Sequence, residues 1–149
     1  RKDAVLYIVG KGSLRGYLQS LINECGLQEQ VILAGGDKPP EEIALWMNSC
    51  DVFVLPSISE GNPVVMFEAL GCGKPFIGTN VGGIPEVVTD ENLGILVDPK
   101  DTQSLARSII IALEMDWNSK YIHEYSKQFT WEMIAKRILD QYDNILNDR

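Results

Sequence analysis

Short apolar segments alternate along the chain with segments of helical spacing, and this alternation limits the possible folds more than any other feature. We predict strands at about 4–10, 30–36, 51–57, 74–80 and 94–99. Continuous apolar runs of this kind are typical of strands that are buried on both faces. Strands that alternate with helices predict an α/β domain, Rossmann-like and in three α/β/α layers, whose mainly parallel sheet is joined by right-handed crossovers.

The segments between and after the strands carry helix signals. Apolar spacing predicts helices after Ser13, at about 40–50, 63–71, within 81–88, and at 101–113, 117–127 and 130–146. We expect Ser13, Asn62, Asp101 and Thr130 to be N-cap residues, with Pro63 at the first helical position of its helix.

Size, charge and cysteine content narrow the class of protein. A chain of 149 residues fits one domain, and its net charge of −8 argues against a nucleic-acid partner. No apolar run is long enough to span a bilayer, no signal peptide is visible, and we expect a cytoplasmic protein. Cys25, Cys50 and Cys72 are far apart among apolar residues, which predicts buried, reduced thiols.

Glycines gather where the predicted strands end. In open α/β sheets, ligands bind beyond the carboxyl ends of the strands. Gly10, Gly12, Gly35 and Gly36 lie at such ends, where they would let a ligand approach the backbone closely. Loops of this type are often glycine-rich for packing reasons alone, so both readings stay open. The segment 10–16 misses the third glycine of the dinucleotide fingerprint by one position, which argues against hydride transfer with NAD.

The segment 57–75, SISEGNPVVMFEALGCGKP, combines a helix start with two carboxylates. Free N–H groups near Val64 and Val65 and the helix dipole favour a phosphate there. Glu68 follows Val64 by four residues and therefore lies on the same side one turn further on, whereas Glu60 precedes the helix. Ionised carboxylates accept hydrogen bonds from hydroxyl groups. A diphosphate with a sugar at each end, as in a nucleotide sugar, would use both carboxylates.

The stretch from Glu60 to Glu68 resembles the E-x7-E motif of retaining GT-B glycosyltransferases, the GT4 or glycosyl transferase group 1 family. VLYIVGKG, QVILAGG, CDVFVLPSISEGNP, EALGCGKPFIGTNVGGIPEVV, LGILVDP and FTWEMIAKRIL follow the order of that family's C-terminal domain. The resemblance implies that residues 1–149 form the donor-binding half of a GT-B fold without its first strand and helix. It also implies that the helix in 130–149 packs toward an N-terminal domain.

The resemblance further implies a retaining, hexosyltransferase-type enzyme that moves a sugar from a nucleoside-diphosphate donor to an acceptor hydroxyl. Glu60 would be catalytic by stabilising positive charge on the donor sugar, and Glu68 would bind the ribose. The other implied donor-binding residues are Gly10, Gly12, Gly35, Gly36, Gly61, Asn62, Val64 and Val65, with Gly35 and Gly36 facing the base. The loop Gly82-Gly83-Ile84-Pro85-Glu86 is a family signature that we expect to be mainly architectural, with a direct contact to the ligand as the alternative. No metal or cofactor is implied.

Departures from the family pattern qualify this hypothesis. Asn62-Pro63 replaces the usual Phe-Gly and removes one amide, which leaves the donor's identity open. The family's diphosphate-binding arginine and lysine precede the residues present here, and Lys11 is a weak substitute. The absent strand would lie mid-sheet, so the chain could be strained, rearranged or paired with a second copy.

Alternatives to this reading also remain. We expect the isolated chain to be almost inactive, with a carbohydrate or lipid-linked acceptor bound by the absent domain. No membrane contact is indicated in this segment, and a membrane-surface role for the longer protein stays open. Rival functions are a nucleotide-sugar epimerase of the same fold and a non-catalytic nucleotide-binding or interaction module. His123 is predicted to be a surface residue, and Trp131 to pack in the core or between domains.

Overall fold

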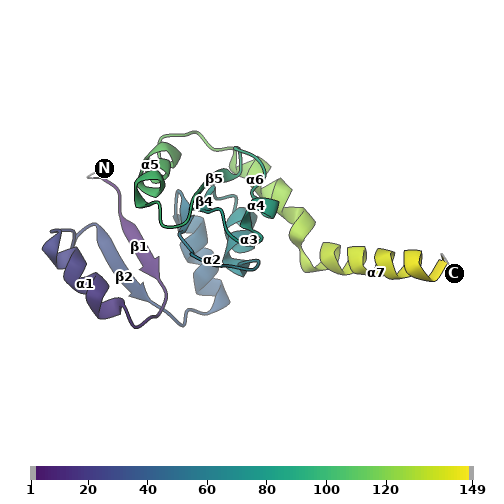
Figure 1. Ribbon diagram of the computed structural model, residues 1–149, viewed down its shortest axis with the longest axis horizontal. Helices are drawn as coiled ribbons and strands as arrows, with labels where there is room; N and C mark the ends of the chain where they lie inside the picture. The colour runs from purple at the N-terminus through teal and green to yellow at the C-terminus, as the bar shows by residue number, and fades with distance from the viewer. Residues whose placement is uncertain (1–2, 148–149) are drawn as a thin grey trace. The chain divides into compact units, whose positions relative to one another are not determined.

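The computed structural model describes residues 3–147 and divides into two compact units. Unit 1 is Arg1–Ile43 and unit 2 is Ala44–Arg149. Each unit is described here by itself (Figure 1). Helix α2, Pro40–Ser49, begins at the end of unit 1 and continues into unit 2. The expectation of one domain over residues 1–149 stays a prediction.

Unit 1 is a β-α-β segment. Strand β1, Leu6–Val9, pairs in parallel with β2, Val31–Gly35, and helix α1, Arg15–Glu24, connects them. Helix α1 buries Ile22, and Gly26 follows the helix with a φ of 67°, a left-handed conformation that suits glycine at a helix exit. The predicted cap at Ser13 is wrong. Leu14 is the N-cap residue, because the chain first closes a turn in which the Arg15 N–H donates to the Gly12 carbonyl at 3.2 Å.

Unit 2 contains a parallel sheet in the order β3-β4-β5 and most of the helices. Its strands are β3, Phe53–Leu55, β4, Phe76–Thr79, and β5, Gly94–Val97. Its helices after α2 are α3, Val64–Gly71, α4, Ile84–Val87, α5, Thr102–Ala112, α6, Ser119–Ser126, the 3-10 helix η1, Lys127–Phe129, and α7, Trp131–Asn147. The central strand β4 is buried along its whole length, in the core formed by Met66, Leu70, Phe76, Ile84, Val87, Val88, Leu93 and Ile122.

The prediction of an α/β fold with parallel strands is confirmed, and every predicted strand and helix is present. Among the described residues the strands form two sheets, one of β1 and β2 and one of β3, β4 and β5. Strand β1 therefore has β2 as its only strand partner in this part of the chain, and β3 has only β4. Leu6 and Tyr7 in β1 remain almost half exposed, although the sequence predicted a buried strand there.

Cap and burial predictions for single residues had mixed outcomes. Asp101 caps α5 by accepting the Ser104 N–H at 3.0 Å, and this hydrogen bond holds the pKa of the Asp101 carboxyl below its usual range. Thr130 caps α7 by accepting the Met133 N–H at 3.4 Å. A core position for Trp131 is wrong, because its side chain is 80% exposed.

The cysteines differ from one another in burial. Cys25 is exposed, which corrects the expectation that all three thiols are buried; it is the C-cap residue of α1. Cys50 and Cys72 are partly buried and unpaired, and burial raises the pKa of both thiols. Both are therefore largely protonated at neutral pH.

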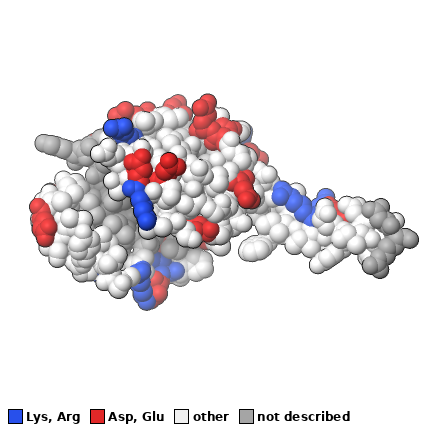
Figure 2. Space-filling view, in the orientation of Figure 1, with Lys and Arg blue, Asp and Glu red and all other residues white. Residues whose placement is uncertain are grey.

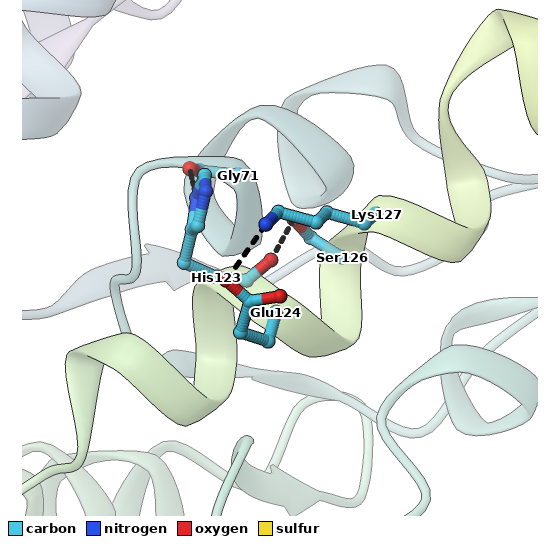
Figure 3. Close-up of polar contacts among 5 residues, drawn as sticks. All are labelled: Gly71, His123, Glu124, Ser126 and Lys127. Atoms are coloured by element: carbon cyan, nitrogen blue, oxygen red, sulfur yellow. Dashed lines mark hydrogen bonds and ion pairs between the residues drawn. The ribbon is translucent and has the colours of Figure 1, made fainter.

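Helix α6 holds α3 in place (Figure 3). Ile122 of α6 is fully buried in the core of unit 2, and the His123 ring donates from Nδ1 to the Gly71 carbonyl at 2.6 Å. Because Gly71 is the last residue of α3, this bond satisfies a carbonyl that the helix itself leaves without a partner. His123 is exposed, as predicted, and its contact is with the backbone of α3.

We expect replacement of Asn118 with alanine to loosen this arrangement. The Asn118 side chain accepts the Tyr121 N–H at 3.0 Å and so caps α6. Loss of an N-cap of this type lowers the free energy of unfolding by about 1 kcal/mol. Chemical denaturation of the Asn118→Ala and Asn118→Asp variants should show the loss only for alanine, because aspartate keeps an accepting oxygen. Equal stability of the alanine variant and the parent would contradict this role.

Acidic and basic side chains are interspersed on the face shown in Figure 2, without a broad basic area. Among residues 3–147, no helix is long and apolar enough to cross a membrane. In the same range no three His, Cys, Asp or Glu side chains lie close enough to hold a metal ion together.

Candidate functional site in the loop between β3 and α3

The loop between β3 and α3 contains Glu60 and is held from the side by β4. The Thr79 hydroxyl, at the carboxyl end of β4, donates to the Ser57 carbonyl at 2.5 Å. The Ser57 hydroxyl in turn donates to Glu60 Oε1 at 2.6 Å. Glu60 is half-buried, so its carboxylate is partly enclosed by protein and still reachable from solvent. The site thus lies at the carboxyl ends of parallel strands, where the alternation of strands and helices predicted it.

The Gly82-Gly83 turn packs directly against this loop. A Cβ atom on Gly82 would collide with the Glu60 carbonyl, and one on Gly83 would collide with the Asn62 side-chain oxygen. Gly82 also has a φ of 55°, a conformation that disfavours other residues. The Gly83 N–H donates to the Gly61 carbonyl at 2.8 Å. Both glycines therefore allow two loops to approach closely, which agrees with the architectural role predicted for them.

The start of α3 differs by one residue from the prediction. Pro63 is the N-cap residue, with φ −68° and ψ 120°, and Val64 is the first helical residue. Asn62 does not cap the helix, because its side chain is turned against Gly83. The Pro63 carbonyl accepts the Met66 N–H at 3.0 Å. The N–H groups of Val64 and Val65 precede that bond and have no acceptor within the helix.

The helix start and the two glutamates together form a surface that offers both N–H donors and carboxylate acceptors. Val64 is 62% exposed and Glu68 is exposed, so the first turn of α3 faces solvent on the side that carries Glu68. Glu68 lies about 6 Å along the axis from Val64. The helix dipole favours an anion at Val64 and Val65, while the carboxylates on either side accept hydrogen bonds from hydroxyls. A phosphate flanked by hydroxyl-bearing groups suits this order of groups.

The four predicted glycines of unit 1 form a second group. The Gly10 N–H donates to the Gly35 carbonyl at 2.7 Å, and Gly36 packs against Lys11 and the Gly10 backbone. Gly10 and Gly12 line a pocket together with Lys11, Arg15 and apolar side chains that include Leu18 and Leu33. Lys11 forms an ion pair with Asp37, so its charge is already matched, which weakens its role as a substitute cation for a diphosphate.

The two groups of predicted residues belong to different units. Gly10, Gly12, Gly35 and Gly36 lie in unit 1, and Glu60, Gly61, Asn62, Val64, Val65 and Glu68 lie in unit 2. Within each unit the structure brings the predicted residues together. The donor-binding and catalytic roles assigned to them stay predictions.

Ser57 and Thr79 lie at strand ends where a ligand was expected, but the sequence did not predict the hydrogen bonds that link them to Glu60. Thr79 is the one polar side chain of β4 and is only 2% exposed. A hydroxyl in an otherwise apolar buried strand needs a hydrogen-bond partner, and this requirement was the available signal. The identity of the partner depends on the parallel register of β3 and β4, which sets Leu55 opposite Gly78.

Comparisons with known proteins identify the family and the fold. A family model described as "Glycosyl transferases group 1" matches residues 1–129. An uncharacterized glycosyltransferase of Methanocaldococcus jannaschii is 33% identical over 151 residues, which cover 95% of this chain and 37% of that protein. A D-inositol 3-phosphate glycosyltransferase of Paenarthrobacter aurescens is 33% identical over 153 residues, covering 95% of this chain and 36% of that protein.

A solved structure, Anabaena HepE in complex with UDP-glucose, has the same fold over 94% of this chain and 41% of its own. Its TM-score is 0.76 and its identity is 24%. The chain spans about two fifths of the length of the curated relatives it matches. The family match covers most of the sequence, including the Glu60–Glu68 motif, and the structural likeness covers nearly all of it. This chain belongs to the glycosyl transferase group 1 (GT4) family and is the C-terminal α/β part of its GT-B fold.

Proposed function

We propose that the full-length protein transfers a sugar, with retention of configuration, from a nucleoside-diphosphate donor to an acceptor hydroxyl, and that this chain binds the donor. The observation that carries the proposal is the pair of carboxylates, Glu60 and Glu68, on either side of the open N-terminus of α3. The amides of Val64 and Val65 bind the phosphate nearest the sugar, Glu68 binds the ribose hydroxyls, and Glu60 faces the transferred sugar. The helix start stabilises the departing diphosphate, which contributes most to the rate.

The binding partners named for similar proteins support this choice of ligand. Anabaena HepE binds UDP-glucose, and its fold matches this chain. We propose a donor of the same chemical class, and Gly10, Gly12, Gly35 and Gly36 stay predicted donor-binding residues of unit 1. The acceptor is a carbohydrate or a lipid-linked sugar bound by an N-terminal domain of the longer protein. Unpaired, partly buried Cys50 and Cys72 favour a reducing compartment, and we place the reaction in the cytoplasm.

Substitution of the two glutamates tests the proposal. Calorimetry of the full-length protein with UDP-, GDP- and ADP-glucose first identifies the donor that binds. Glu68→Gln should weaken binding of that donor by about tenfold, because the amide accepts hydroxyl hydrogen bonds less strongly than a carboxylate. Glu60→Gln should lower kcat for release of the nucleoside diphosphate from the donor by about 100-fold and change donor affinity little.

Glu91→Gln is the matched control, because Glu91 is an exposed glutamate of unit 2 in the loop before β5. It should leave binding and turnover unchanged. Unchanged turnover in Glu60→Gln would contradict the proposal and favour a non-catalytic nucleotide-binding module. Conversion of the donor to its epimer, without transfer to an acceptor, would favour an epimerase.

A further inference from the structure

A buried hydroxyl at the end of β4 fixes the backbone beside the candidate catalytic residue. Thr79 is 2% exposed, and its hydroxyl donates to the Ser57 carbonyl at 2.5 Å. Leu55 of β3 pairs in parallel with Gly78 of β4, so the residues that follow the two strands lie side by side. Thr79 and Ser57 therefore meet although they are 22 positions apart in sequence. Because Thr79 has almost no contact with solvent, its hydroxyl needs a partner within the protein, and the Ser57 carbonyl is that partner.

The second link joins the backbone to the carboxylate. The Ser57 hydroxyl donates to Glu60 Oε1 at 2.6 Å, a short bond typical of a hydroxyl on a charged acceptor. It restrains one carboxylate oxygen, while Oε2 keeps lone pairs that can face a ligand. The far side of the loop is held by the Gly83 N–H, which donates to the Gly61 carbonyl at 2.8 Å. Glu60 is therefore restrained on both sides of its own backbone position.

We propose that Ser57 and Thr79 are positioning residues that set the orientation of the Glu60 carboxylate for sugar transfer. This inference rests on the proposed function, because it assigns Ser57 and Thr79 a role through Glu60. A carboxylate that stabilises charge in a transition state must already be aimed at the reacting atom before the reaction begins. Loss of the Ser57 hydroxyl frees the Glu60 side chain to adopt other rotamers, which lowers the rate of the chemical step and leaves ground-state donor binding nearly intact.

The test compares kcat and KM in the full-length protein, with the donor identified by calorimetry among UDP-, GDP- and ADP-glucose. Ser57→Ala should lower kcat about tenfold with KM changed less than about twofold, and Ser57→Thr should restore most of the loss because it keeps a hydroxyl. Thr79→Val should lower kcat by a similar factor, and Thr79→Ser should restore it. Ser126→Ala is the matched control, because its hydroxyl donates to the His123 carbonyl at 2.7 Å on α6, away from the Glu60 loop.

A double-mutant comparison separates this inference from the function on which it rests. If Ser57 acts through Glu60, then Ser57→Ala should have no further effect on kcat in a Glu60→Gln background. Unchanged kcat in Ser57→Ala, or the same tenfold loss in both backgrounds, would overturn the inference. Unchanged turnover in Glu60→Gln alone would overturn the proposed function instead. If Thr79→Val fails to fold in a melting experiment, Ser57→Ala and its threonine rescue decide the outcome.

Discussion

Replacement of Gly82 with alanine is expected to lower both the stability of unit 2 and the activity of the full-length protein. The added Cβ would occupy the position of the Glu60 carbonyl and would also approach the Gly61 carbonyl to 3.0 Å. Alanine is in addition strained at the φ of 55° that Gly82 adopts. Strain and collision together should reduce the free energy of unfolding by about 2–4 kcal/mol.

Activity should fall because the Glu60 carbonyl must move to make room for the added Cβ. A backbone shift at Glu60 displaces the proposed catalytic carboxylate and the adjoining loop before α3. A displacement of about 1 Å at a reacting centre lowers the rate on the order of 100-fold. A disturbed phosphate site should also weaken donor binding by about tenfold. We therefore expect kcat/KM for the donor to fall by about 1,000-fold, measured as release of the nucleoside diphosphate.

Alanine substitutions at two further glycines serve as comparisons for Gly82→Ala. Gly83→Ala should cost less, because its Cβ meets the Asn62 side chain, which can rotate away. Gly71→Ala should leave activity unchanged, because Gly71 has a helical backbone at the end of α3 and nothing lies within 4 Å of an added Cβ. A Gly82→Ala variant that melts and reacts like the parent would show that the loop does not depend on this close approach.

The sequence predicted the elements of the fold because their signals are local. Apolar runs and helical spacing depend on neighbouring residues, so all strands and helices were found. The cap at Asn62 was predicted wrongly because the preference of asparagine for N-caps is also local. In the folded chain Asn62 turns instead to Gly83, which is distant in sequence. The hydrogen bond between Thr79 and Ser57 was not predicted for the same reason, since it depends on the register of two strands.

Strand pairing is the part of the fold that the sequence predicted least completely. The mainly parallel character is confirmed, but the described residues form two sheets, in which β1 pairs with β2 and β3 pairs with β4. One edge of β1 and one edge of β3 are therefore without a strand partner in this part of the chain. The expectation that an additional strand completes one sheet in the longer protein stays a prediction. Slower amide hydrogen exchange in β1 of the longer protein than in this chain would support it.

The apolar face of α7 remains without a partner among the residues described. Helix α7, yellow in Figure 1, contributes no buried residue, although it runs from Trp131 to Asn147. Large apolar side chains are exposed along it, namely Trp131, Met133, Ile138, Leu139, Tyr142, Ile145 and Leu146. Most of them recur at helical spacing and so lie on one side. We propose that this side packs against an N-terminal domain of the longer protein, since the chain spans about two fifths of its relatives.

Replacement of Ile138 and Tyr142 with glutamate in the full-length protein is expected to abolish almost all sugar transfer. Burial of each apolar side chain of this size contributes about 2 kcal/mol to the free energy of domain packing. Each new carboxylate would in addition lose its hydration on packing, which is unfavourable. A loss of about 4 kcal/mol or more in domain packing corresponds to about 1,000-fold in the population of the closed, active arrangement. Transfer to acceptor should fall by that factor.

Measurements on this chain alone distinguish lost packing from a damaged donor site. Because Ile138 and Tyr142 are exposed in it, the double substitution should leave its melting temperature and its calorimetric donor affinity unchanged. Asn144→Glu, on the opposite side of α7, is the control and should preserve transfer in the full-length protein. Transfer that survives the double substitution would contradict docking of α7 on the N-terminal domain. A dimer of this chain that the double substitution dissociates would assign the same apolar side to a second copy.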